Sequence, residues 1–378
     1  MTILIFLAIL SLLILVHEGG HFWAAKKAGI KVEEFGFGLP PRLWGKKVGE
    51  TIYSINALPF GGFVRLYGEE SRVRKEKHRA FFSQNRKVKI KVLLAGVAMN
   101  FLLGTVAFAL VYSFWGIPQK SHRVKVLKVE DDSPADKAGL KEGDILLMVE
   151  DEIIESNQQF VEAINKRKGK KTIISLERAE ENPCQTNSFW RGEENEGNYL
   201  FCDQGELKAV LFPRVNPPAH QGALGVTISD TEIKFYPFYQ MIPRAIYSGL
   251  EETFFWTREM IASLKGIGQR LLRGESLASL GIAGPVGIYQ VTGQVAKSGG
   301  FWALVQFVGI LSINLAVFNL LPFPALDGGR VIFVFLEKFI GVKKREKIEA
   351  AANMVGMGLL LFFIFLVTVG DIRRIRGN

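Results

Sequence analysis

Residues 2–25 read TILIFLAILSLLILVHEGGHFWAA, and this stretch decides the class of the protein. Its acidic and basic side chains are His17, Glu18 and His21 alone. At about 1.5 Å per residue, a helix of this length would extend about 36 Å, which is enough to cross a hydrocarbon layer of about 30 Å. Ionisable side chains at membrane depth are unfavourable unless they coordinate, pair or line a wet cavity. We therefore expect a membrane-spanning helix that carries a functional site.

The spacing of these three groups indicates a metal site. Residues four apart lie on one face of a helix, so His17 and His21 can direct ring nitrogens at one Zn²⁺. Glu18 lies next to His17 on the helix and can reach a water at the metal as a general base. This pattern is typical of metal-dependent peptidases.

A catalytic zinc usually takes three protein ligands and keeps one position for water. The best candidate for the third ligand is Asp327, in the stretch NLLPFPALDGG at residues 319–329. Pro322 and Pro324 remove backbone donors and end a helix, and the two glycines after Asp327 permit a close turn. Exposed backbone at membrane depth persists only where it lines a cavity. The alternative is an ordinary turn at the membrane surface with Asp327 in solvent.

Three more uncharged runs, at residues 92–117, 301–321 and 350–370, are long enough to span a membrane. The fold class that we expect is therefore a membrane α-helical protein with four spans. Residues 26–91 hold 16 Lys or Arg against six Asp or Glu, which equals the net charge of +10 of the whole chain. Basic loops stay in the cytoplasm, so this charge indicates topology and not nucleic-acid binding. Residues 118–300 are then external, although the basic C-terminus would also lie outside.

Four separated stretches resemble the site-2 protease family of intramembrane zinc metalloproteases, especially the bacterial members that cleave anti-sigma factors. They are HEGGH at residues 17–21, VEEFGFG at 32–38, LPFGGFV at 58–64 and residues 319–329. The resemblance runs over nearly the whole chain. It implies that His17, His21 and Asp327 are the Zn²⁺ ligands and that Glu18 is the base. It also implies that Asn319 contacts the substrate or stabilises an oxyanion, whereas an Asn that bonds its own helix end is the alternative.

Residues 51–68 are expected to form a β-hairpin, because two strand-like segments flank a turn signal. The resemblance suggests that this hairpin is re-entrant and dips towards the active site. A hairpin edge offers unpaired backbone groups to an extended peptide, and a small cytoplasmic hairpin without substrate contact is the alternative. The candidate substrate-binding residues are Gly61, Gly62, Phe63, Pro322 and Pro324.

The external segment begins with a compact domain. The stretch at residues 133–147 resembles the signature of PDZ domains, and strands at 123–130 and 172–176 with a short helix at 160–165 complete an α+β pattern. Such a domain binds peptide by strand addition and would select substrates or regulators, while a packing or size-exclusion element is the alternative. Many family members carry two tandem PDZ domains, whereas the space here fits one.

The two cysteines of the chain, Cys184 and Cys202, flank a polar insertion on the side assigned as external. Oxidation is permitted there, so we expect a disulfide, although two free thiols remain an alternative. Further on, residues 246–271 form an amphipathic helical pattern that is too charged for a span. That helix would lie along the outer membrane surface, gate access beneath the PDZ-like domain or pack on its core.

These observations predict an intramembrane zinc metalloprotease that cleaves single-pass membrane proteins within or near their transmembrane segments. We expect a multi-pass protein of the bacterial cytoplasmic membrane, with anti-sigma factors or signal-peptide remnants as substrates and a peptide or regulator at the PDZ-like domain. The rival functions are a receptor or adaptor with a structural zinc, and a zinc-dependent transporter. The expected parts are two spans with the hairpin loop at residues 1–117, the PDZ-like domain at 118–216, an amphipathic linker region at 217–300 and two spans at 301–378.

Overall fold

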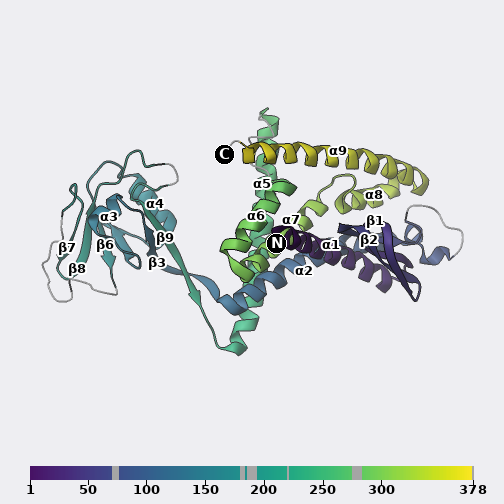
Figure 1. The fold of residues 1–378 in the computed structure, drawn as a ribbon, viewed down its shortest axis with the longest axis horizontal. Helices are drawn as coiled ribbons and strands as arrows, with labels where there is room; N and C mark the ends of the chain where they lie inside the picture. The colour runs from purple at the N-terminus through teal and green to yellow at the C-terminus, as the bar shows by residue number, and fades with distance from the viewer. Residues whose placement is uncertain (70–75, 179–183, 185–193, 219–220, 275–282, 377–378) are drawn as a thin grey trace. The chain divides into compact units, whose positions relative to one another are not determined.

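The computed structural model describes residues 1–69, 76–178, 184, 194–218, 221–274 and 283–376. The chain forms two compact units (Figure 1). Unit 1 combines residues 1–115 with residues 237–378, and unit 2 consists of residues 116–236. The elements of unit 1 are α1 (Thr2–Lys27), β1 (Val32–Val48), β2 (Thr51–Leu66), the 3₁₀ turns η1 (Lys77–Arg79) and η2 (Phe81–Ser83), α2 (Arg86–Trp115), α5 (Phe238–Leu272), α6 (Pro285–Ser298), α7 (Gly300–Leu320), α8 (Asp327–Ile340) and α9 (Val342–Arg376).

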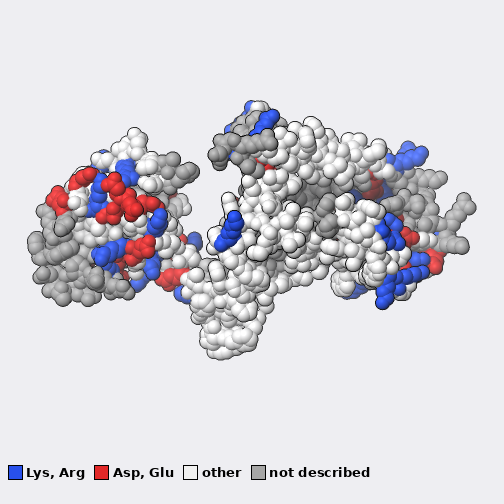
Figure 2. Space-filling model, in the orientation of Figure 1, with Lys and Arg blue, Asp and Glu red and all other residues white. Residues whose placement is uncertain are grey.

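Among the described residues, four helices are long and apolar enough to cross a membrane, namely α1, α2, α7 and α9. This finding confirms the four expected spans by length and composition. Large apolar side chains remain exposed on these helices, including Leu4, Leu102, Phe114 and Phe365. On the face drawn in Figure 2, the helical part of unit 1 is almost free of charged residues, and its charges gather near the β1–β2 end. A surface of this kind is suited to lipid.

Helix α2 is the central element of unit 1, because α1, α5, α7 and α8 all pack against it. Small residues let the helices approach closely, as is common between membrane helices. The Ser312 hydroxyl on α7 donates to the Asn100 carbonyl on α2 at 2.8 Å. The hydroxyls of Thr105 on α2 and Thr253 on α5 lie 3.0 Å apart. These polar contacts fix α2 against two neighbouring helices.

The hairpin predicted within residues 51–68 is wrong. Residues 51–66 form one strand, β2, which pairs with β1 across a turn at residues 49–50. Two distant parts of β2, at Ile52 and at Arg65, both pair with Glu34 of β1. The first part of β1 therefore lies between the two segments that were expected to pair with each other.

The prediction is wrong because residues 32–38, which the resemblance identifies as a family motif, form the first part of strand β1. Their burial alternates along the chain, which is the pattern of a strand with one buried face. The nearly buried Glu34 carboxylate accepts from Arg42 at 2.7 and 3.0 Å and from Arg65 at 3.3 Å, which holds the sheet together. The sheet contributes to a hydrophobic core, which consists of Ala25, Ile30, Val32, Leu66, Phe81, Val92, Leu93 and Val334.

The described residues of unit 2 form a seven-stranded antiparallel sheet with two short helices. The strands pair in the order β7-β8-β6-β4-β3-β9, and β5 pairs with β4. Its core includes the buried side chains of Val124, Leu146, Phe160 and Ile174. The elements are β3 (Ile117–Val129), α3 (Pro134–Ala138), β4 (Ile145–Val149), β5 (Glu152–Ile153), α4 (Asn157–Asn165), β6 (Thr172–Glu177), β7 (Tyr199–Asp203), β8 (Glu206–Leu211) and β9 (Val226–Lys234).

The external domain expected from the sequence ends at residue 216, but unit 2 continues to residue 236. The reason is that β9 returns to pair with β3 along most of its length. The region expected to be a linker, residues 217–300, is thus divided between the two units. Its long amphipathic helix is α5, which packs against α2 and α7 within unit 1.

The structure joins Cys184 to Cys202 of β7 in a disulfide, with the two Cα atoms 5.6 Å apart. The predicted pairing is confirmed. Residues 185–193, which lie between the cysteines, are outside the described residues.

We expect neither cysteine to react with a thiol-specific reagent in the denatured, unreduced protein, and both to react after reduction. Mass spectrometry of the labelled full-length chain would measure this. Because the disulfide closes a loop with an 18-residue separation, reduction should lower the free energy of unfolding by about 3 kcal/mol in the chain-entropy model. Complete labelling before reduction would contradict the pairing.

Candidate metal centre

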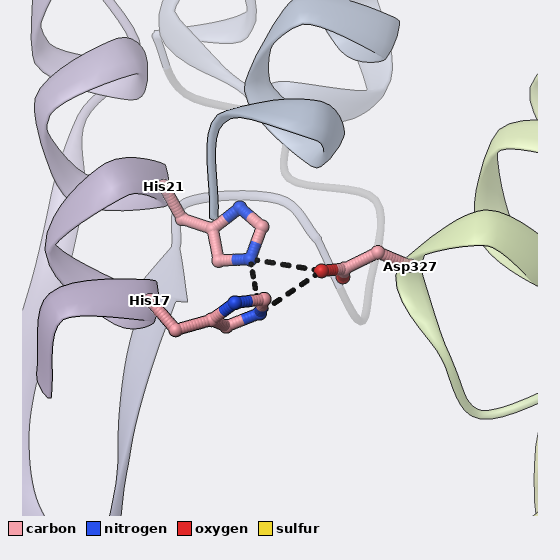
Figure 3. Close-up of side chains that lie close together, drawn as sticks. All are labelled: His17, His21 and Asp327. Atoms are coloured by element: carbon pink, nitrogen blue, oxygen red, sulfur yellow. Dashed lines mark hydrogen bonds and ion pairs between the residues drawn. The ribbon is translucent and has the colours of Figure 1, made fainter. Parts of the chain in front are cut away.

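Helix α1 presents His17 and His21 on one face, as expected from their spacing, and the N-terminal residue of α8, Asp327, approaches them from the other side (Figure 3). The Oδ2 atom of Asp327 lies 3.0 Å from His17 Nε2 and 3.3 Å from His21 Nε2. The two Nε2 atoms are 3.3 Å apart. All three side chains are nearly buried, with exposed fractions of 9%, 12% and 11%. The structure therefore brings together the three residues predicted as metal ligands.

The position of Asp327 follows from the loop before it. Helix α7 ends at Leu320, just before the two prolines, as predicted. The sequence predicts a close turn at the two glycines after Asp327. In the structure they instead lie in the first helical turn of α8. A Cβ atom on Gly328 would be 2.3 Å from the Leu320 carbonyl oxygen, so only glycine fits this approach. Asn353 of α9 accepts a hydrogen bond from the Ala325 amide at 3.0 Å and holds the loop.

The hydrogen bonding of His21 shows what these three groups can bind. Its Nδ1 lies 2.8 Å from the carbonyl oxygen of Val92, which only accepts, so Nδ1 carries the proton. In the neutral ring, Nε2 then has a free lone pair, which faces the Asp327 carboxylate. Two acceptors in contact repel unless a cation lies between them. The donor set of two imidazoles and one carboxylate suits a catalytic zinc.

The distances also fit zinc. Ligand atoms bonded to a tetrahedral zinc at about 2.0–2.1 Å lie about 3.3 Å from each other. The three measured separations of 3.0, 3.3 and 3.3 Å are close to this value. Within the described ranges, this trio is the group of His, Cys, Asp and Glu side chains whose ligand atoms are close enough to hold one metal ion.

Helix α2 supports the two imidazoles, and these contacts are not among the features predicted from the sequence. The fully buried Asn100 side chain places Nδ2 at 3.2 Å from His17 Nδ1, while its Oδ1 has no hydrogen-bond partner in the described part of the chain. The two amide atoms are interchangeable by rotation, and in the rotated amide Oδ1 would accept a hydrogen bond from the N–H at Nδ1. His17 would then also direct the lone pair of Nε2 at the metal site. A polar Asn within an apolar span is the signal that could have identified this residue.

Gly96, one helical turn before Asn100, provides the space for both rings. A Cβ atom at this position would be 2.5 Å from His21 Nε2 and 2.8 Å from His17 Cε1. Such contacts are too short for any real side chain, so α2 can approach the imidazoles only because this residue is glycine.

The three groups lie at a cavity of about 360 Å³. Of the other predicted site residues, Glu18, Asn319 and Phe63 line this cavity. Gly62 lies close to Glu18, since a Cβ on the glycine would be 3.7 Å from the Glu18 Cγ. The remaining candidates are elsewhere: a Cβ on Gly61 would face Leu39, and Pro322 and Pro324 are not among the described residues that line the cavity.

Comparison with known proteins agrees with this geometry. The sequence profile of peptidase family M50 matches residues 5–363. A protein of Clostridium perfringens strain 13 named as a zinc metalloprotease is 33% identical over 374 residues, which cover 98% of both chains. The zinc metalloprotease RasP of Geobacillus kaustophilus is 28% identical, with 99% of this chain and 98% of the relative covered.

A third relative, the regulator of sigma-W protease RasP of Bacillus subtilis, is 26% identical over 453 aligned positions. The alignment covers 99% of this chain and 99% of the relative. These matches confirm the resemblance to the site-2 proteases and extend it over nearly the full length. The chain thus belongs to peptidase family M50 and is a zinc metalloprotease of the membrane-embedded, site-2 protease type.

Proposed function

We propose that His17, His21 and Asp327 hold the zinc ion and that the cavity beside them hydrolyses peptide bonds within or near transmembrane segments of single-pass membrane proteins. The observation that carries this proposal is the convergence of three metal-binding atoms within 3.3 Å of one another, beside a further carboxylate and a primary amide. A zinc ion held by these groups would supply Lewis-acid chemistry to water and to a peptide carbonyl.

Glu18 and Asn319 have distinct roles in this proposal. Glu18 follows His17 on α1, and its side chain lines the same cavity, so its carboxylate accepts a proton from the attacking water and returns it to the leaving amine. Asn319, on the last turn of α7, lines the cavity from the side of Asp327. Its amide N–H is suited to bind the carbonyl oxygen of the scissile bond, where negative charge develops.

The sheet of unit 1 supports a peptide as the substrate. Phe63 and Val64 of β2 line the cavity, and the backbone of Gly62 lies beside Glu18. A transmembrane helix hides its peptide carbonyls in its own hydrogen bonds, so the substrate has to unwind locally before cleavage. An extended segment could then add to the edge of β2 by backbone hydrogen bonds. The loop that contains Pro322 and Pro324 supports the cavity by leading into Asp327, and its Ala325 lines the cavity.

The substrate class that we propose is anti-sigma factors or signal-peptide remnants in the bacterial cytoplasmic membrane. The Bacillus subtilis relative is named a regulator of sigma-W protease, which supports the first of these. The excess of Lys and Arg in residues 26–91 favours a cytoplasmic location for the β1–β2 sheet. Unit 2 would then be external, and the disulfide between Cys184 and Cys202 agrees with an oxidising compartment.

We further propose that unit 2, residues 116–236, is the PDZ-like domain and that it binds a peptide or regulator. The support is the antiparallel sheet with two short helices, which has the α+β composition expected from the sequence. A receptor or adaptor with a structural zinc remains the rival function. The position of Glu18 on the cavity wall disfavours this rival, because a structural zinc site needs no carboxylate beside its ligands.

The central test is Glu18→Gln. The amide keeps the size and the hydrogen-bonding capacity of the side chain but cannot accept a proton, so zinc content should stay at about one per chain while cleavage falls at least ~10²-fold. Metal analysis and cleavage of a membrane-spanning reporter by the purified protein would measure both. Normal cleavage by this variant would contradict the peptidase mechanism and favour the receptor.

The ligand assignment predicts a different outcome for three other variants. His17→Ala, His21→Ala and Asp327→Ala each remove a ligand, so zinc content and cleavage should fall together. Asp327→Asn leaves a neutral oxygen and should retain part of the zinc. Stoichiometric zinc and full activity in Asp327→Ala would show that another residue is the third ligand.

Gly96→Ala tests the close approach of α2 to the imidazoles. The added methyl group should displace both rings and lower the affinity for zinc about tenfold or more, although no ligand is removed. The matched control is Gly358→Ala on α9, where a Cβ would meet no atom within 4 Å. Competition with a zinc chelator would measure the affinities, and equal affinity in the two variants would refute the proposed role of Gly96.

A further inference from the structure

The metal cavity contains an arginine that the proposed mechanism does not use. Arg330, one helical turn after Asp327 on α8, is the basic residue among the described residues that line the cavity, apart from the two histidines. The acidic residues that line it are Glu18, Glu69 and Asp327. The cavity is therefore rich in carboxylates, with one guanidinium among them.

Arg330 is held at the boundary between the metal cavity and a second, larger cavity. Its guanidinium forms an ion pair with Glu69, the residue three positions after β2, and lies 3.8 Å from Glu349 of α9. The second cavity has a volume of about 730 Å³ and lies between β2 and α9. The residues that line both cavities are Phe63, Val64, Glu69, Ala325 and Arg330. The ion pair thus forms part of the wall that the two cavities share.

This arginine remains charged although it is largely buried. Burial alone would lower the pKa of Arg330, but the carboxylates of Glu69 and Glu349 outweigh this effect and raise it above its ordinary value. Glu349 also lies 3.3 Å from Arg345, which in turn donates to Glu337 at 2.8 Å. Acidic and basic groups therefore alternate from Glu69 along α8 and α9.

Hydrolysis of a peptide bond creates a charge that the cavity has to accommodate. The elements of water add across the C–N bond, which leaves a carboxylate on one fragment and an amine on the other. In a site with little water, the new carboxylate is repelled by the acidic side chains already present. A guanidinium binds a carboxylate by two parallel hydrogen bonds, which are about twice as strong as neutral ones.

We propose that Arg330 binds the newly formed carboxylate of the cleaved peptide, in exchange for Glu69, and that the second cavity accommodates the end of that fragment. This inference rests on the proposed peptidase function of the metal cavity. In the structure the Arg330 guanidinium already binds one carboxylate, that of Glu69, which a product carboxylate would replace. The second cavity is lined by Arg65, Arg330 and Arg345 against Glu69 and Glu349, which suits an anionic chain end.

The test compares two probes that differ in one group. They are an apolar hexapeptide with an N-terminal fluorescent label and a free C-terminal carboxylate, and the same peptide with a C-terminal amide. Binding to the purified, zinc-loaded, full-length protein in detergent is measured by fluorescence anisotropy, which does not depend on turnover. The wild-type protein should bind the carboxylate about tenfold or more tightly than the amide. In Arg330→Gln, the ratio of the two affinities should fall to about one.

Two further variants keep the test decisive. Arg330→Gln leaves Glu69 without its main partner and could fail to fold, so Arg330→Gln with Glu69→Gln removes both charges and should also lose the preference. Arg79→Gln is the matched control, because Arg79 also pairs with a glutamate, Glu50, and is 31% exposed, but is not among the described residues that line either cavity. This control should keep the preference of the wild-type protein.

The outcomes separate this inference from the proposed function. A preference that persists in the Arg330 variants would mean that the zinc ion anchors the carboxylate, and it would overturn the role of Arg330. Equal binding of both probes by the wild-type protein would overturn it as well. Either result is compatible with cleavage of the membrane-spanning reporter, whereas failure of the wild-type protein to cleave that reporter concerns the peptidase function itself.

Discussion

The central constraint on unit 1 is that three electron-pair donors, which repel one another unless a proton or a metal ion lies between them, are held together inside an apolar helix assembly. His17, His21 and Asp327 direct acceptor atoms at one point, although each atom would be more stable facing water or a proton donor. The surrounding elements oppose this repulsion. The Val92 carbonyl fixes one ring, the Asn100 amide contacts the other, and Asn353 holds the loop before the carboxylate. A divalent cation converts the same arrangement from unfavourable to favourable, so metal binding and packing are coupled.

The sequence predicted those parts of the structure that depend on local pattern. The spacing of His17 and His21 determines a shared helix face, the two prolines after Leu321 end α7, and long uncharged runs determine the spans. The stretch around Asp327 makes it a candidate for the third ligand, and the family resemblance supports its place beside the histidines, since no local pattern relates residues about 300 positions apart. The disulfide could be predicted from the sequence because the chain contains two cysteines, which can form one pair.

Other features could not be predicted, because they arise from contacts between distant segments. The β1–β2 pairing depends on residues 32–38, which fit a strand only once their buried face has a partner. Gly96 looks like an ordinary residue of a membrane helix, and Asn100 is marked only as a polar residue in an apolar span, until α1 lies against α2. Helix α5 has one apolar face, but its sequence does not say whether that face meets the external domain or the spans, and tertiary packing decides. The alternating charges from Glu69 to Glu337 are likewise assembled from loops and helices that are far apart in the chain.

The separation of Asp327 from the two histidines also has a consequence during synthesis. Helix α1 leaves the ribosome first, and α8 follows about 300 residues later, which corresponds to roughly 15–60 s at bacterial elongation rates. Throughout this interval, His17, Glu18 and His21 are in a nascent membrane helix, and Asp327, the third ligand that we propose, has not been made. The growing chain therefore exposes polar groups to the bilayer or the insertion machinery before any peptidase site exists. A protease assembled in this way cannot cleave membrane proteins until its own synthesis is nearly complete.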